Sequence, residues 1–408
     1  MSLTRGSGPF RLRSLVVPVY LPTFLFAIGQ GAVIPIIPLF ALELGASVAV
    51  AGAMVALRGF GTMAFDVPSG VMVSRLGERG AMLAGTIMLA VVAFGSAFSV
   101  SIWMFGPLVF LMGCSWAVWL LARLSYATDV SPEHYRGRVL SLLGGTNRIG
   151  NFVGPFIGGF AATWFGLEAA FIIQAVLALA AAVLMFLVVD EPERTTVREP
   201  EAVHRQVFAV VREHRRVFAT AGSVTVAIQV LRSARHAVIP LWGDHIGLDP
   251  AQISIIFGLS SAIDMTLFYP VGVVMDRLGR KWAAVPCLAI MSAGMLLIPL
   301  SGAFWSLLVA SLITGFGNGL GSGINMTLGA DFSPRETRGE FLGVWRLIGD
   351  VGTSGGPAVI SVVTAVGTLG AASAASGGIG LVGAAIMIFL VEEPMRRARV
   401  VENEARSK

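Results

Sequence analysis

The chain has 408 residues, of which 55% are hydrophobic and 13% are charged. Soluble globular domains carry about 25% charged residues, so this composition excludes an ordinary soluble enzyme or nucleic-acid-binding domain. The formal net charge of +5 fits a membrane protein, because basic residues collect in the cytoplasmic loops of such proteins. The two cysteines, Cys114 and Cys287, fall inside apolar segments, so neither a disulfide framework nor a metal site is expected.

Long apolar segments alternate with short polar breaks along the chain. A helix of about 20 apolar residues crosses a hydrocarbon core of about 30 Å. We therefore predict an all-α membrane protein with twelve transmembrane helices in two pseudo-symmetric six-helix bundles. The first segment is too long for a signal-peptide core, so we expect it to be retained. The expected helices span residues 15–40, 48–73, 81–99, 103–126, 138–164, 167–189, 217–241, 251–274, 282–300, 304–328, 340–365 and 372–391.

Charged loops predict the topology and the division of the chain. Basic loop residues all lie on one predicted side of the membrane, while the opposite loops contain acidic residues such as Glu43 and Glu168. By the positive-inside rule, both termini of this multi-pass protein are expected on the cytoplasmic side of the cell membrane. The expected parts are an N-terminal bundle (1–189), a cytoplasmic linker (190–216), a C-terminal bundle (217–391) and a cytoplasmic tail (392–408).

The two predicted bundles repeat each other at a constant offset of 202 residues. Two parallel six-helix repeats with a pathway between them are typical of a transporter. The matching pairs include Gly70 with Gly272, Arg75 with Arg277, Gly77 with Gly279, Asp129 with Asp331, Gly150 with Gly352, and Pro155 with Pro357.

The loop after the predicted eighth helix carries a dense motif of glycines and charges. Glycine permits a tight reversal, and the acidic and basic side chains can pair with each other or with a neighbouring helix end. The first-bundle copy is degraded, because Ser74 stands where the second copy has Asp276. An ordinary basic loop is the alternative interpretation for both copies. The motif residues are Gly272, Asp276, Arg277, Gly279 and Arg280 in the second copy, and Gly70, Arg75 and Gly77 in the first.

The predicted fifth helix has a stripe of small residues. Gly150, Gly154 and Gly158 recur every fourth residue, and Gly159 follows. Such a stripe lets two helices approach backbone to backbone, while Pro155 removes one helical hydrogen bond and bends the helix. A generic helix-packing face is the alternative interpretation.

These motifs together resemble the Major Facilitator Superfamily, and in particular its twelve-helix drug:proton antiporters. The fifth-helix pattern is similar to the antiporter motif of those exporters, and its trailing glycine pair is missing from the second-bundle copy. The resemblance implies alternating access, with the loop motif as a cytoplasmic latch. It also implies that helix 5 faces helix 8, and that helix 2 faces helix 11. Because of Ser74, we expect the Asp276 copy to carry more of the latch.

Charges inside the predicted helices need partners, because each costs at least a few kcal/mol in a bilayer. At about 1.5 Å per residue, Arg148 and Asp264 lie at similar depths, and so do Asp66 and Arg346. We predict the cross-bundle pairs Arg148–Asp264 and Asp66–Arg346, with Arg346–Asp350 as a further i,i+4 pair. Asp264 is the first candidate for proton coupling, followed by Asp66 and Asp350. Permanent structural ion pairs are the alternative.

The resemblance also implies a cavity lined by helices 1, 4, 7 and 10. Aromatic side chains beside a few polar groups suit an amphipathic small molecule. Six arginines against three aspartates in the predicted helices disfavour lipophilic cations. The expected lining residues are Gln30, Trp116, Trp119, Arg123, Gln229, Arg232, Arg235, Asn318 and Asn325.

We therefore predict a proton-coupled exporter of small amphipathic, drug-like compounds. A transporter of anionic metabolites, by symport, is the first alternative. A membrane enzyme is another, but no nucleophile–base pairing or metal cluster is recognisable. A sensor that moves no substrate is the third. The expected partners are a small-molecule substrate, protons and the lipid bilayer; we expect no cofactor, no metal, no nucleic acid and a monomeric protein.

Overall fold

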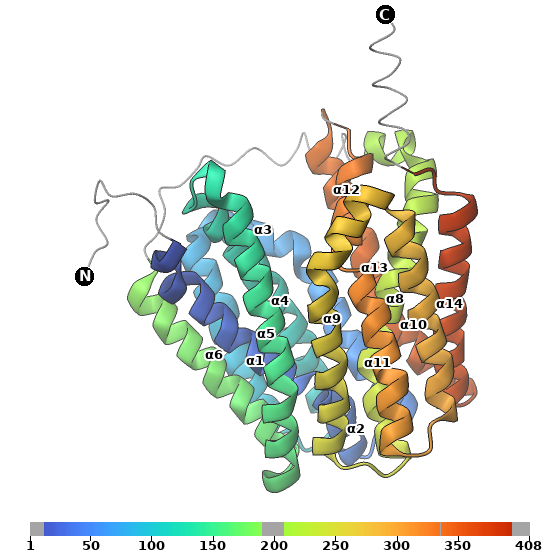
Figure 1. Ribbon diagram of the computed structural model, residues 1–408. Coiled ribbons are helices and arrows are strands. Elements are labelled where there is room, and N and C mark those ends of the chain that lie inside the picture. The colour runs from blue at the N-terminus through green and yellow to red at the C-terminus, as the bar shows by residue number, and fades with distance from the viewer. Residues whose placement is uncertain (1–11, 190–207, 335, 394–408) are drawn as a thin grey trace, which may run out of the picture. The chain divides into compact units, whose positions relative to one another are not determined.

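The computed structural model describes residues 12–189, 208–334 and 336–393, and these residues contain helices and no strand (Figure 1). Ten helices in the described part are long and apolar enough to cross a membrane. One of them, α3 (Val48–Ala97), contains two rods, because Gly77 has a non-helical backbone with φ 75° and ψ 169°. With α5 (Glu133–Phe165), whose 33 residues also span a bilayer, the twelve-helix architecture is confirmed. Most of the predicted linker (190–207) and the tail from 394 onward lie outside the described residues.

Prolines and caps set the helix boundaries in the first half. The first predicted helix is interrupted at Ile34 and Pro35, because Pro38 cannot donate a backbone hydrogen bond to the Ile34 carbonyl. Ser101 caps the fourth helix, since its Oγ accepts from Met104 N at 3.4 Å. Besides α3 and α5, the elements are η1 (Leu12–Leu15), η2 (Val16–Tyr20), α1 (Leu21–Val33), α2 (Ile36–Glu43), α4 (Ile102–Asp129) and α6 (Glu168–Val188).

The second half differs from the expectation at the tenth predicted helix. A continuous helix was predicted there, but it ends at Leu320 and restarts at Ile324. Gly323 has φ 81°, a left-handed conformation that glycine adopts without strain. The elements are α8 (Arg215–His245), α9 (Pro250–Leu278), α10 (Lys281–Leu297), η3 (Ile298–Leu300), α11 (Phe304–Leu320), α12 (Ile324–Phe332), α13 (Arg338–Val366) and α14 (Leu369–Phe389).

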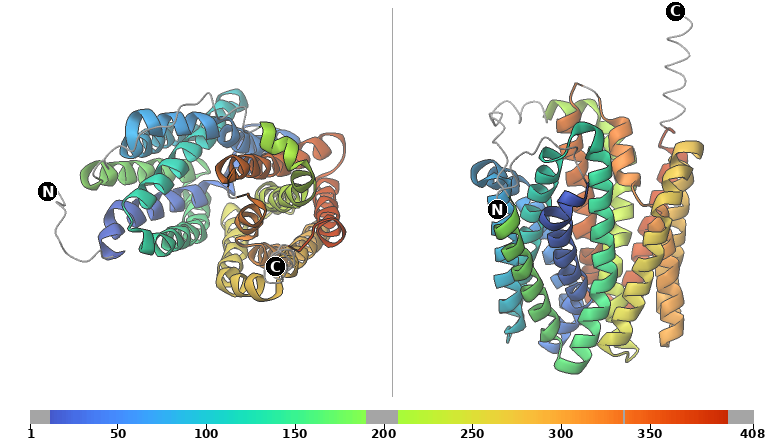
Figure 2. Two further views of the ribbon diagram at one scale, coloured as in Figure 1. Left: turned by 90° about the horizontal axis from the view of Figure 1, so that it is seen from above. Right: turned by 60° about the vertical axis from the view of Figure 1, so that its left-hand side comes forward.

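The chain forms two compact units, and each is described here by itself. Unit 1 comprises Met1–Ser47, Leu57–Val197 and Asp249–Gly258; unit 2 comprises the remainder, including Val48–Ala56. In unit 1, α1 packs against both α5 and α6 (Figures 1 and 2). In unit 2, α8 packs in the same way against α13 and α14.

The glycine stripe of α5 lies against α1. A Cβ on Gly154 would be 2.7 Å from both Gly31 Cα and Ala32 N, so only glycine allows this approach. The repeat preserves this contact in unit 2. Gly150 of α5 faces Ala27, and its counterpart Gly352 of α13 faces Gln229, which is 202 residues after Ala27. The repeat read from the sequence is therefore also a repeat of helix packing.

Candidate functional site

A polar cluster lies beside the interrupted helix in unit 2. Asp264 is on α9, Arg232 on α8 and Asn318 near the end of α11. Asn318 Nδ2 donates to Asp264 Oδ2 at 2.7 Å, and Arg232 Nε donates to Asn318 Oδ1 at 2.6 Å. Ser322 Oγ adds a bond of 3.2 Å to the other carboxylate oxygen of Asp264. One amide thus connects a carboxylate and a guanidinium at mid-helix positions.

Arg232 also stabilises the end of α11. Its Nη2 donates to the Gly321 carbonyl at 2.7 Å, and its Nη1 donates to Gln229 Oε1 at 3.2 Å. Gln229 Nε2 continues the network to Thr353 Oγ1 on α13 at 3.1 Å. Carbonyl groups at a helix C-terminus carry partial negative charge, so a guanidinium there is favourable. Interrupted transmembrane helices with charged partners at the break are typical of transporter binding sites.

Glycines make this arrangement possible. Residues Gly315 to Gly323 alternate glycine with other residues, and this run contains the break. A Cβ on Gly319 would lie 3.2 Å from Asp264 Cα, so α11 approaches α9 closely there. Sequence reasoning found Asp264, Arg232, Gln229 and Asn318 but missed Ser322 and the break. The glycine run is the signal that could have found both.

The predicted cavity residues of the first half pack among themselves inside unit 1. Arg58 donates a hydrogen bond to the side-chain oxygen of Gln30. The Trp119 ring stacks on Phe26, with centroids 3.8 Å apart, and Trp116 lies 5.7 Å from Trp119. The Arg123 guanidinium carbon lies over the Trp119 ring, 4.1 Å from the ring centroid. Their role in lining a transport pathway stays a prediction.

The remaining predicted residues have separate surroundings. Asn325 accepts a hydrogen bond from Trp345 Nε1 at 2.8 Å, and Arg235 is buried. Arg346 Nε lies 3.7 Å from Asp350 Oδ2, which is the i,i+4 contact expected on α13. The pairs Arg148–Asp264 and Asp66–Arg346 join residues of different units and stay predictions.

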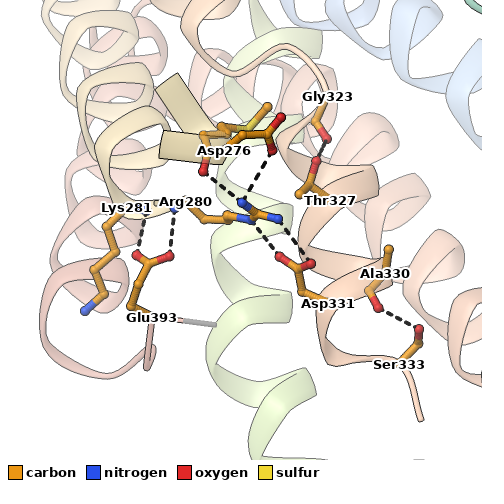
Figure 3. Close-up of polar contacts among 10 residues, drawn as sticks. Asp276, Arg280, Lys281, Gly323, Thr327, Ala330, Asp331, Ser333 and Glu393 are labelled. Atoms are coloured by element: carbon orange, nitrogen blue, oxygen red, sulfur yellow. Dashed lines mark hydrogen bonds and ion pairs between the residues drawn. The ribbon is translucent and has the colours of Figure 1, made fainter. Parts of the chain in front are cut away.

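The loop motif of unit 2 is organised around Arg280 (Figure 3). Its Nε and Nη2 donate to the two carboxylate oxygens of Asp331 at 2.7 and 3.3 Å. Asp276 is more distant, 3.7 Å from Arg280 Nη1, and its side chain is 80% exposed. Glu393 accepts from the backbone N–H groups of Arg280 and Lys281, which begin α10, at 2.8 and 3.0 Å. Asp331 is therefore the main acidic partner of Arg280, and the latch role expected of Asp276 stays a prediction.

The first copy of the loop motif has the same glycine backbone conformation as the second copy, but it has no arginine at the position of Arg280 to form the corresponding ion pair. Gly77 and Gly279 both have positive φ, 75° and 109°. Arg79 Nη2 bonds to the Phe186 carbonyl at 2.7 Å, as Lys281 Nζ bonds to the Ile388 carbonyl at 2.9 Å. The positions of Asp276 and Arg280, however, hold Ser74 and Glu78. Glu78 accepts from Ser125 Oγ at 2.8 Å instead.

The described residues contain no group of three or more His, Cys, Asp or Glu side chains that could hold a metal ion.

The structure consists of two repeated helical units. Unit 2 has a charged polar cluster at a broken helix and a bidentate ion pair in its loop motif. A sequence profile of the Major Facilitator Superfamily matches residues 19–233 and 230–407. The chain belongs to the Major Facilitator Superfamily.

Two proteins with names that refer to drug resistance are similar to about three-quarters of this chain. Multidrug resistance protein 2 of Bacillus subtilis is 26% identical over 304 residues, covering 72% of this chain and 74% of that protein. Quinolone resistance protein NorA of Staphylococcus aureus is 22% identical over 321 residues, covering 73% and 77%. A crystal structure of a D-xylose-proton symporter has the same fold, with a TM-score of 0.71, 16% identity and coverage of 94% and 98%.

Proposed function

We propose that this transporter is a proton-coupled exporter of small amphipathic compounds, and that Asp264 binds the proton. The observation that carries the proposal is the Asp264–Asn318–Arg232 chain at the break between α11 and α12. The named drug-resistance relatives support the substrate class. The transporter acts as a monomer in the cell membrane, with both termini on the cytoplasmic side, as the basic loops favour.

The chemistry of the cluster suits a coupling role. While Asp264 is ionised, its bonds from Asn318 and Ser322 are charge-assisted and therefore strong. Protonation removes that charge and weakens both bonds to Asp264. Asn318 is then held mainly by its bond from Arg232. Because Arg232 also holds the Gly321 carbonyl, the same event changes the support of the broken helix. A proton on Asp264 therefore biases α11 and α12 between two arrangements, which is what alternating access requires.

The experiment uses inverted membrane vesicles with a fluoroquinolone or another fluorescent amphipathic probe in the outer solution. An imposed pH gradient, acidic inside the vesicle, is expected to drive probe accumulation, and Asp264→Asn is expected to abolish it. The matched control is Asp249→Asn, because Asn can also cap α9 where Asp249 Oδ1 accepts from Gln252 N at 2.9 Å. Full pH-driven transport by Asp264→Asn would rule out its coupling role.

The second candidate is transport of an anionic metabolite, driven by proton symport. The six arginines against three aspartates in the membrane helices favour anionic cargo, and the D-xylose-proton symporter shares the fold. Imposing the gradient in each direction separates the two candidates. Movement of an organic anion together with protons, with no movement of the amphipathic probe against them, would favour symport and overturn the exporter proposal.

A further inference from the structure

Arg123 on α4 is a buried cation inside unit 1. Only 7% of the residue is exposed, and it sits in the helical interior beside a core cluster that includes Tyr20, Met82, Tyr126 and Met185. A guanidinium cannot lose its proton in a protein. It therefore needs a compensating negative group, because an uncompensated charge in a membrane helix costs several kcal/mol.

Protein groups supply only part of that compensation. The guanidinium lies 4.1 Å from the Trp119 ring centroid, and such a contact contributes about 2 kcal/mol when both groups are desolvated. Arg123 Nε and Nη1 nevertheless have no hydrogen-bond acceptor among the described residues, and neither does Trp119 Nε1. Each buried donor left without an acceptor costs about 1–3 kcal/mol. Glu78 of α3 accepts a hydrogen bond from Ser125 Oγ, two residues after Arg123, at 2.8 Å.

Arg123 and Trp119, which carry these donors, both line a small cavity. Its volume is about 10 Å³, which is room for a single water-sized particle. Thr23 also lines it, but the Thr23 hydroxyl donates to the Val19 carbonyl of its own helix at 2.7 Å. No carboxylate is among the described residues around the cavity. The lining residues are Pro18, Val19, Pro22, Thr23, Met82, Trp119, Arg123, Tyr126 and Met185.

The size and the charge of the site select the occupant. A monatomic anion requires much less adjustment of the lining than a phosphate group does, and the surplus of donors over acceptors disfavours a cation. A single water could accept from two of the donors, but it would leave the positive charge of Arg123 without a counter-charge. A halide ion accepts from several donors and neutralises the guanidinium. Met82 and Met185 have flexible side chains that can adjust to an ion slightly larger than water.

We propose that the cavity beside Arg123 binds a chloride-sized monovalent anion, which stabilises unit 1. The site lies within the six-helix unit and is separate from the Asp264 cluster of unit 2. Chloride thus acts as a structural counter-ion for a buried arginine, and not as transported cargo.

The test is halide-dependent stability of the purified full-length transporter in detergent. Thermal unfolding is measured while chloride or bromide replaces gluconate at constant ionic strength. Binding to the folded state alone raises the melting temperature with halide concentration, so a saturable rise is expected for the native protein. Arg123→Gln is expected to remove the dependence. Trp119→Phe, which loses one donor, is expected to weaken halide binding about fivefold to tenfold.

Thr23→Val is the matched control. It changes the lining of the same cavity, but the hydroxyl it removes donates to the Val19 carbonyl and not into the cavity. The halide dependence of this variant is expected to equal that of the native protein. If Arg123→Gln does not fold, Trp119→Phe and bromide anomalous diffraction from native crystals decide the matter. A bromide peak beside Arg123 supports the proposal. A native melting temperature that ignores halide, a dependence that survives Arg123→Gln, or density for water or a lipid phosphate at the site would overturn it.

Discussion

Gly154→Ala tests whether the α5 stripe holds unit 1 together by close backbone packing. The added Cβ would meet the Ile28 carbonyl oxygen of α1 first, and Gly31 Cα and Ala32 N at 2.7 Å. Ordinary contact begins near 3.4 Å, so the two helices must separate by at least about 0.7 Å. Neighbouring Gly150 and Gly158 would lose contact as well. Overpacking of this kind costs about 1–3 kcal/mol, and we expect the free energy of unfolding to fall by that amount.

The same helix provides a matched control. A Cβ on Gly144 would meet nothing within 4 Å, so Gly144→Ala should gain up to about 1 kcal/mol from helix propensity. Reversible unfolding in mixed detergent micelles, followed by far-UV circular dichroism, measures both variants. The two substitutions are chemically identical and are expected to change stability in opposite directions. A Gly154→Ala protein as stable as the native one would refute the packing argument.

Two further predictions concern charged groups. Arg280→Gln should lower the free energy of unfolding by about 1–3 kcal/mol, because Asp331 loses a bidentate partner. Thermal melting should show no comparable loss for the control Arg277→Gln, because the Arg277 side chain is exposed. Equal losses in the two variants would contradict the role given to Arg280. Burial, and secondarily repulsion from Glu168, raises the pKa of Glu43 above its usual 4.5. The folded protein then holds that proton more tightly than the unfolded chain, so the Glu43 contribution to stability is present at acidic pH and is lost as pH rises through the raised pKa. Glu43→Gln should therefore melt higher than the native protein at neutral pH and not below pH 4.5, and a constant difference across this range would argue against it.

The helix count, the repeat and the importance of the glycine stripe could be predicted from the sequence. Bilayer thickness fixes the length of each apolar segment, and a shared offset of 202 residues is visible without coordinates. The structure extends the repeat to contacts: Gly150 faces Ala27 as Gly352 faces Gln229. The pattern of apolar segments and the 202-residue repeat thus predict the helices and which helices pack together within one unit.

Partner choice was harder to predict. The bonds from Asn318 and Ser322 to Asp264 were not predicted from the sequence, and they lie on either side of the helix break; the Arg148–Asp264 pair stays a prediction. Hydropathy cannot reveal that break, since a glycine run remains apolar. Likewise, the sequence showed that the charges of the loop motif can pair, but it did not identify Asp331 of α12 as the bidentate partner of Arg280. Long-range polar contacts depend on side-chain reach between helices, which no local pattern encodes.

The short helix α12 links two distant polar contacts. It follows Ser322, which bonds to Asp264, and it carries Asp331, which bonds to Arg280. Its nine residues form a rod about 13 Å long, and the left-handed Gly323 stands at its start. A pivot of about 10° would move the far end by about 2 Å, enough to carry a hydrogen bond beyond its working range. On the proposed role of Asp264 as the proton-binding group, α12 would connect protonation at one end of the helix with the Arg280–Asp331 ion pair at the other.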